Sequence, residues 1–170
     1  MSQRMTALMD RPFVVFLIGM RINKWWRPDL WLPVAMSMPK MVAELEADPE
    51  SGFLGYESGG LGNPSIMVQY WRSSEDLMAY ARNKDQTHFP AWAAFRKRVA
   101  DTDAVGIWHE TFVVSPANYE CVYGNMPAFG LGKVGQLVPA HGPLATAKRR
   151  LGAGAKGGEA GAAASEVAAA

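Results

Sequence analysis

The chain has 170 residues, of which 49% are hydrophobic and 19% are charged, and its formal net charge at pH 7 is +1. This hydrophobic content supports a packed core, so the composition excludes a wholly disordered protein. The small net charge argues against a polyanion-binding chain, so we expect no nucleic-acid partner. A single cysteine excludes an intrachain disulfide framework and a cysteine-rich zinc module.

The first predicted element is an apolar stretch, FVVFLIGM, over residues 13–20. It is too short to span a bilayer, and Arg21 to Lys24 follow where a signal peptide would have its cleavage site. The stretch therefore predicts a buried strand over about residues 12–20. We expect a cytoplasmic protein without a membrane partner.

A helix is predicted to follow, because apolar residues between Leu30 and Leu45 recur at spacings of three and four. Asp29 is expected to cap its N-terminus. Pro39 is expected to kink the helix or restart it, because proline lacks the N–H that an interior turn needs. The sequence Asp48-Pro49 should end it.

Two strands are predicted next, over residues 53–57 and 66–72, on either side of a glycine-rich turn. Ser73 and Asp76 then have the approximate spacing of a capping box, which predicts a helix start. A second helical piece is predicted over residues 88–100.

The last predicted strands cover residues 105–114 and 119–123, which we expect to pair with each other across a short turn. From Leu151 onward the sequence consists mostly of alanine and glycine. Such a segment buries too little area to offset its ordering, so we expect a flexible, dispensable tail over residues 146–170. Lys148 to Arg150 should be a solvated charge cluster in it.

The resulting order, β-α-β-β-α-β with an extra C-terminal strand, predicts an α+β, ferredoxin-like domain over residues 1–145. Its helices should cover one face of the sheet. Because Trp71 neighbours Tyr70 and Trp108 neighbours Ile107, both sheet faces carry apolar side chains. An uncovered apolar face favours a homodimer that packs sheet against sheet.

Resemblance to a known superfamily is carried by six segments: FVVFLIGMRINKWW, GFLGYESG, VQYWRS, HFPAWAAF, GIWHETFVV and YECVYGNMPAFGLGK. These segments, within residues 10–145, resemble the dimeric α+β barrel superfamily, which includes antibiotic-biosynthesis and haem-degrading monooxygenases. They resemble most specifically a bacterial and fungal branch labelled monooxygenase-like. The resemblance implies a dimeric barrel and cofactor-independent oxidation of a small apolar or aromatic substrate in its cavity.

His109 and Glu110 are the first candidate catalytic residues. They lie in mid-strand and must point to opposite faces, so we expect one of them to line the cavity as a proton acceptor. A carboxylate among aromatic residues is costly unless it is paired or protonated, and a structural pair at an interface is the alternative.

His88 is the third catalytic candidate, although capping of the helix start is an alternative use for it. Trp92 and Phe95 follow on the same helix face, where the resemblance implies substrate-holding residues. The remaining candidate substrate-binding residues are aromatic, and core packing is their alternative role: Tyr56, Trp71, Tyr80 and Trp108.

Two other functions stay open at this point. One is a haem-binding barrel, dehydratase-like or oxygenase-like, with His109 or His88 as the axial ligand, which the resemblance implies. The other is a non-catalytic ligand-binding or interaction module. No spacing of residues indicates a metal site.

Overall fold

The computed structural model describes residues 4–59 and 62–151. The chain forms two compact units. The first, here called the sheet–helix unit, comprises Val15–Phe112, and the second, here called the terminal unit, comprises Met1–Val14 and Val113–Ala170. The predicted single domain over residues 1–145 thus corresponds to parts of two units.

The elements of the sheet–helix unit follow the predicted order. They are β2 (Phe13–Ile22), α1 (Pro28–Ala47), β3 (Phe53–Gly59), β4 (Ile66–Trp71), α2 (Ser74–Arg82), α3 (His88–Arg98) and β5 (Val105–Val114). Short 3₁₀ turns follow α1 (Pro49–Ser51) and α3 (Ala100–Thr102). The strand predicted at residues 12–20 is therefore confirmed as β2.

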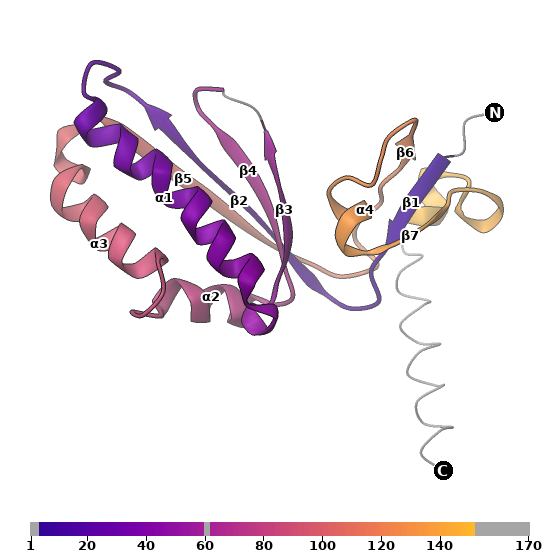
Figure 1. Ribbon diagram of the computed structural model, residues 1–170. Helices are drawn as coiled ribbons and strands as arrows, with labels where there is room; N and C mark the ends of the chain where they lie inside the picture. The colour runs from indigo at the N-terminus through magenta and orange to yellow at the C-terminus, as the bar shows by residue number, and fades with distance from the viewer. Residues whose placement is uncertain (1–3, 60–61, 152–170) are drawn as a thin grey trace, which may run out of the picture. The chain divides into compact units, whose positions relative to one another are not determined.

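The four strands form one sheet in the order β3-β4-β2-β5. This arrangement is the ferredoxin-like split βαβ, so the expected α+β fold class is confirmed. Figure 1 shows α1, α2 and α3 together on one face of this sheet. Their contact is apolar: Leu30, Val99, Ala104 and Val105 form a buried cluster. The opposite sheet face has no helix of this unit on it.

Helix α1 differs from its prediction in two ways. Arg27, not Asp29, occupies the N-cap position, and Asp29 lies in the first turn, where it accepts two hydrogen bonds from the Arg27 guanidinium. The helix also continues without interruption through Pro33 and Pro39. Both prolines lie on its exposed side, where water can solvate the carbonyls that lose a backbone donor.

The terminal unit contains a strand that the sequence analysis missed, β1 (Arg4–Leu8). It pairs antiparallel with β6 (Tyr123–Gly124) and β7 (Gln136–Pro139), so the predicted pairing of residues 119–123 with residues 105–114 is wrong. Three single turns complete this unit: α4 (Leu131–Val134), a 3₁₀ turn (Gly142–Leu144) and α5 (Ala147–Arg150).

Arg150 corrects the predicted solvated cluster at residues 148–150. Its side chain is 6% exposed, and its Nε donates to Glu120 Oε2 at 2.9 Å while its Nη1 donates to the Leu144 carbonyl at 3.1 Å. The first residues of the predicted tail are thus tied to the terminal unit. The rest of that prediction, over residues 152–170, lies outside the described residues.

Replacing Arg150 with methionine should lower the free energy of unfolding of the terminal unit by about 2 kcal/mol. The change leaves the partly buried Glu120 carboxylate and the Leu144 carbonyl without their donor. Chemical denaturation of the full chain measures the loss. Arg149→Met is the matched control, because Arg149 is exposed, and an equal effect of both changes would contradict the assignment.

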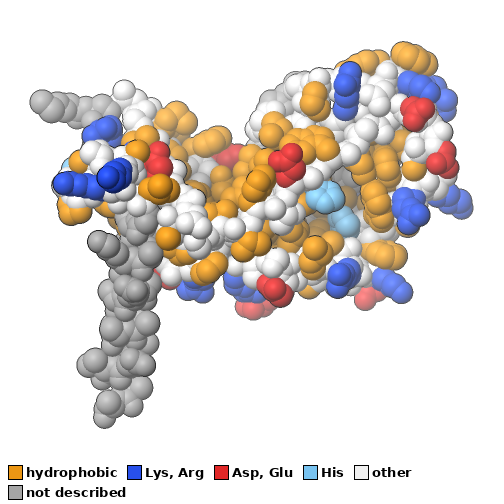
Figure 2. All heavy atoms as spheres, turned by 180° about the vertical axis from the view of Figure 1, so that it is seen from behind, with side chains coloured by type: hydrophobic (Ala, Val, Ile, Leu, Met, Phe, Trp, Pro, Cys, Tyr) orange, Lys and Arg blue, Asp and Glu red, His pale blue; other side chains and the backbone are white. Residues whose placement is uncertain are grey.

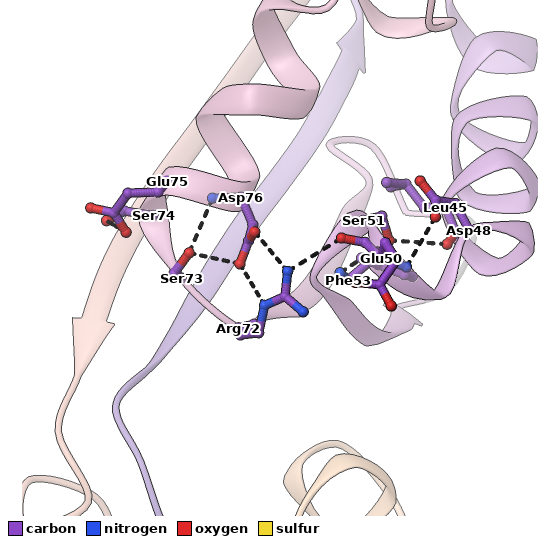
Figure 3. Close-up of polar contacts among 10 residues, drawn as sticks. All are labelled: Leu45, Asp48, Glu50, Ser51, Phe53, Arg72, Ser73, Ser74, Glu75 and Asp76. Atoms are coloured by element: carbon purple, nitrogen blue, oxygen red, sulfur yellow. Dashed lines mark hydrogen bonds and ion pairs between the residues drawn. The ribbon is translucent and has the colours of Figure 1, made fainter.

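The start of α2 confirms Ser73 as its predicted cap, although the side chain of Asp76 contacts the Ser73 hydroxyl and not its backbone N–H. The Asp76 N–H donates to Ser73 Oγ at 3.1 Å, and Ser73 Oγ donates back to Asp76 Oδ2 at 2.7 Å. Figure 3 shows how Arg72 completes the cluster: its guanidinium donates to both carboxylate oxygens of Asp76 and to the Glu50 carbonyl. These hydrogen bonds hold the end of β4 to the beginning of α2.

Ser73→Ala should destabilise the protein by about 1 kcal/mol, the usual effect of losing a helix cap. Ser74→Ala is the control, because the Ser74 hydroxyl donates only to the exposed Glu75 carboxylate and should change stability by less than about 0.5 kcal/mol. Urea denaturation near pH 7 measures the free energy of unfolding of both variants. Equal losses would show that the Ser73 cap contributes no stability of its own.

Asp76 adds a pH dependence to this helix start. Hydrogen bonds from Arg72 hold the pKa of the Asp76 carboxyl below its ordinary value of 3.8. Its stabilising effect is therefore complete above that value and is lost as the pH falls through the lower pKa of the folded protein. The stability difference between the wild-type protein and Asp76→Asn should accordingly shrink below about pH 4. A difference that stays constant down to pH 2 would contradict this.

Candidate functional site

His109 lies on the face of β5 that is turned toward the helices. Val105, four residues earlier, packs against Leu30 of α1 in the buried cluster. Because side chains alternate along a strand, Ile107 and His109 share the side of Val105. The imidazole of His109 also lies against Phe16 of β2, with 5.5 Å between ring centroids. We call this face the helix side of the sheet.

Glu110 and Trp108 lie on the other face, here called the open side. A Cβ atom at Gly19 would come within 2.7 Å of Trp108 Nε1, so the indole crosses β2 directly over this glycine. Alternation places Glu110 on the same side as Trp108. The carboxylate is exposed, so it is not enclosed among aromatic residues within one chain. The predicted set of site residues is therefore divided between two faces.

The helices leave part of the helix side of β5 uncovered. Ile107 is 41% exposed although it shares a side with the buried Val105, and His109 is also exposed. On α3, Trp92 is 42% exposed and stacks on Phe95, with ring centroids 5.5 Å apart and planes at 13°. Figure 2 shows histidine side chains in a hollow of this unit, bordered by hydrophobic side chains.

A continuous series of ring contacts joins four of the predicted site residues on the helix side. Tyr56 stacks on Phe53 with centroids 6.2 Å apart, and Phe53 meets the edge of Trp71 at 5.2 Å. Trp71 in turn lies 5.9 Å from Tyr80, and Tyr80 lies 6.0 Å from His88. The series extends from the sheet to the start of α3 and ends at an imidazole.

His88 is oriented by the end of α2. Its Nδ1 lies 2.9 Å from the carbonyl oxygen of Ala81. A carbonyl oxygen only accepts hydrogen bonds, so Nδ1 carries the proton of this contact. In the neutral ring the other nitrogen, Nε2, then holds a lone pair and can accept a proton. The alternative role predicted for His88 was to cap α3, but in the structure its side chain contacts the Ala81 carbonyl instead.

Tyr80 is fixed in its neutral form by Glu44 of α1. The phenol hydroxyl donates to Glu44 Oε2 at 2.9 Å. Burial, and then the hydrogen bond and charge of Glu44, raise the pKa of Tyr80 far above its ordinary value. The same carboxylate accepts the backbone N–H of Thr87 at 3.0 Å. Glu44 thus ties α1 to Tyr80 and to the residue before His88, which makes Tyr80 a positioning group rather than a base.

Trp71 is the member of the ring series that lies deepest in the core, together with Gln69. Trp71 is 1% exposed, and its Nε1–H donates to Gln69 Oε1 at 3.0 Å. The buried Gln69 amide also contacts the sulfur atoms of Met38 and Met67, at 3.9 and 3.5 Å. Trp71 therefore packs in the core, which is the alternative role that the sequence analysis gave for it.

Two residues that shape this region were not found from the sequence, Gln69 and Glu44. Gln69 could have been found from strand alternation, because it lies two residues before the predicted Trp71 and shares its side. Glu44 gave no signal, since nothing local distinguishes it from other helical glutamates. Both stabilise the surroundings of His88 from elements distant in the sequence.

No cluster of three or more potential metal-ligating side chains occurs among the described residues. None of the helices in the described part of the chain combines the length and apolar character that a membrane crossing needs. The candidate residues that remain on the helix side are Tyr56, Tyr80, His88, Trp92, Phe95 and His109.

Comparison with known proteins gives one family. The model of the family described as "Monooxygenase af470-like" matches residues 13–131, which is more than half of the chain and includes every candidate site residue. The resemblance inferred from the sequence segments is therefore confirmed. No curated protein matches the chain.

Among solved structures, the cofactor-independent oxygenase SnoaB from Streptomyces nogalater is 12% identical and has a TM-score of 0.42, with 60% of this chain and 92% of that chain covered. Rv0793 from Mycobacterium tuberculosis is 14% identical, with a TM-score of 0.42 and coverages of 59% and 92%. A dimeric ferredoxin-like protein of unknown function from Bacteroides fragilis is 14% identical, with a TM-score of 0.41 and coverages of 62% and 99%. Similarities this distant establish neither the activity nor the assembly of this chain.

Proposed function

We propose that this chain, which belongs to the monooxygenase af470-like family by its match over residues 13–131, oxidises a small apolar or aromatic substrate with molecular oxygen. The substrate binds on the helix side of the sheet, between β5 and α3. It supplies the electrons itself, so the reaction needs no bound cofactor. The contact that carries this assignment is the hydrogen bond between His88 Nδ1 and the Ala81 carbonyl, because it leaves Nε2 of the neutral ring as a proton acceptor.

The chemistry that suits such a site begins with an acidic C–H bond on an aromatic substrate. His88 Nε2 takes the proton, and the electron pair left on carbon then reduces oxygen. For a CH₂ group converted to a carbonyl, one oxygen atom enters the product and the other leaves as water, so atoms and electrons balance. Histidine is the side chain that most often performs such a proton transfer in enzymes.

The surrounding side chains position the substrate and exclude water. Trp92 offers an exposed indole face one helical turn from His88, and its stacking on Phe95 holds that face in place. Tyr80 packs against the His88 ring from the other helix, and Tyr56 begins the ring series on the sheet. His109 lies on the opposite wall and is the second candidate for the proton acceptor.

We also propose that the chain is a homodimer that packs through the open side of the sheet. This face carries the exposed residues Ile66 and Phe112 and the indole of Trp108 across β2. An apolar sheet face without a covering layer is a typical contact between copies. Glu110 and Trp108 then belong to the subunit interface, and not to the substrate site of their own chain.

Substitution of His88 tests the catalytic assignment. His88→Ala should lower kcat for oxygen consumption at least 100-fold with a panel of polycyclic phenols and anthrones, because proton abstraction loses its acceptor. Added imidazole should restore part of the rate. Glu110→Gln, on the open side, should change kcat less than twofold. Circular dichroism verifies that each variant is folded.

Three results would contradict the proposal. An active His88→Ala variant together with an inactive His109→Ala variant would move the proton acceptor to His109. Turnover by neither the wild-type protein nor its variants, with tight binding of the same compounds, would favour a ligand-binding module. A Soret band in the protein purified from native expression would favour the haem alternative.

A further inference from the structure

Exposed tryptophans gather at one corner of the sheet–helix unit. Trp25 and Trp26 lie in the connection between β2 and α1, and they are 56% and 72% exposed. The turn is held in shape from within the unit: Trp31 Nε1 donates to the Trp25 carbonyl at 3.2 Å, and the two indole rings lie 5.8 Å apart. Large aromatic side chains are thus presented to solvent on a structured turn.

The apolar surface continues from this turn along α1. Leu32 and Met36 are four residues apart, so they share one face of the helix, and both are exposed. The buried residues of α1 lie on its other face, toward the sheet. We call the surface formed by Trp25, Trp26, Leu32 and Met36 the tryptophan corner.

Basic side chains lie beside the β2–α1 connection, which carries the two tryptophans of this corner. Lys24 Nζ donates to the Thr102 carbonyl at 2.6 Å, which brings the end of α3 and its following turn beside the β2–α1 connection; Figure 1 shows the two segments together. Arg98 is close enough to lower the pKa of Asp29 by its charge, after the larger effect of Arg27.

This region has a higher net positive charge than the chain as a whole. Residues 21–29 and 96–103 contain six basic and three acidic side chains, a net charge of +3, whereas the whole chain has +1. Figure 2 shows lysine and arginine side chains, with some acidic ones, among hydrophobic side chains at this end of the unit. A surface that combines exposed tryptophan, aliphatic side chains and positive charge is complementary to an anionic lipid bilayer.

We propose that the tryptophan corner binds the surface of anionic membranes, with Trp25 and Trp26 inserted at headgroup level. Tryptophan suits this position because its ring is apolar and its N–H remains hydrated. Leu32 and Met36 favour lipid over nucleic acid, because aliphatic side chains gain from contact with acyl chains but offer no aromatic face on which bases stack. No spanning segment is needed, so the proposed binding is peripheral. It departs from the sequence-based expectation that the protein has no membrane partner.

Vesicle flotation with the full chain tests this proposal. The protein should float with vesicles of 70% phosphatidylcholine and 30% phosphatidylserine at about 0.1 M salt, and binding should weaken as salt rises. Trp26→Ala should weaken binding about tenfold, from the apolar area lost. Arg98→Gln should weaken it about fivefold, from one basic charge. Met78→Ala, an exposed methionine on α2, should change it less than twofold.

The outcomes separate lipid from other partners. Quenching of tryptophan emission by brominated lipids, reduced in the Trp26→Phe variant and lost when Trp25 is also replaced by phenylalanine, would support insertion at this corner. Absence of binding to the anionic vesicles, or equal losses from Met78→Ala and Trp26→Ala, would overturn the proposal. So would binding of a single-stranded oligonucleotide but not of vesicles, or protection of Trp26 from soluble quenchers by self-association.

Discussion

Trp71→Ala should lower the free energy of unfolding by about 4 kcal/mol, the largest stability change expected from a single substitution in this chain. The indole is 1% exposed and packs against Phe53 and Tyr80, so its removal leaves a cavity that the sheet and α2 cannot close. It also removes the hydrogen bond to the buried Gln69 Oε1, and an unsatisfied buried acceptor adds to the loss.

Trp92→Ala is the matched control for this experiment, because it is the same chemical change on a side chain that is 42% exposed. It should cost less than about 1 kcal/mol. Trp71→Phe separates the two contributions, since it keeps most of the ring volume but not the N–H. Equal effects of the two alanine substitutions in urea denaturation would show that Trp71 is not part of the core.

The fold of the sheet–helix unit could be predicted because its signals are local. Strand β2 is a mainly apolar run, and the glycine-rich turn between β3 and β4 marks where these two strands end and begin. Ser73 fixes the start of α2 through a contact with a residue only three positions further along the chain. The prolines of α1 show where a local rule fails: the helix tolerates Pro33 and Pro39 because both lie on its exposed side.

The terminal unit was not predictable in the same way. Strand β1 is five residues long, and its partners β6 and β7 lie more than 100 residues further along the chain. Pairing over such a distance leaves no periodic pattern in the sequence near either strand. Arg150 is similar: its burial depends on Glu120 and Leu144, and the surrounding basic residues alone indicate a solvated cluster.

The candidate site was predicted in its residue types but not in its geometry. Strand alternation correctly separates His109 from Glu110, but only the packing of Val105 on Leu30 shows which of them faces the helices. The form of His88 depends on the Ala81 carbonyl at the end of α2. Sequence spacing alone could not reveal that contact, because it depends on how the chain turns between α2 and α3.

The second large effect concerns dimerisation and is expected on the open side of the sheet, where we propose that two copies meet. Phe112→Asp should raise the dimer dissociation constant at least 100-fold. Phe112 is exposed in the single chain and shares the open side with Trp108 and Glu110 by alternation. An aspartate there would bury a second carboxylate beside Glu110 without a partner, which costs several kcal/mol.

Sedimentation at about 10 µM measures this effect, and the concentration is low enough to distinguish a specific dimer from weak self-association. The wild-type protein should sediment as a dimer and Phe112→Asp as a monomer with an unchanged circular dichroism spectrum. Met78→Asp is the control, because Met78 is similarly exposed but lies on α2, away from the open side. A wild-type monomer would contradict assembly through the sheet. Equal dissociation of both variants would contradict it as well, because an interface on the open side buries Phe112 but not Met78.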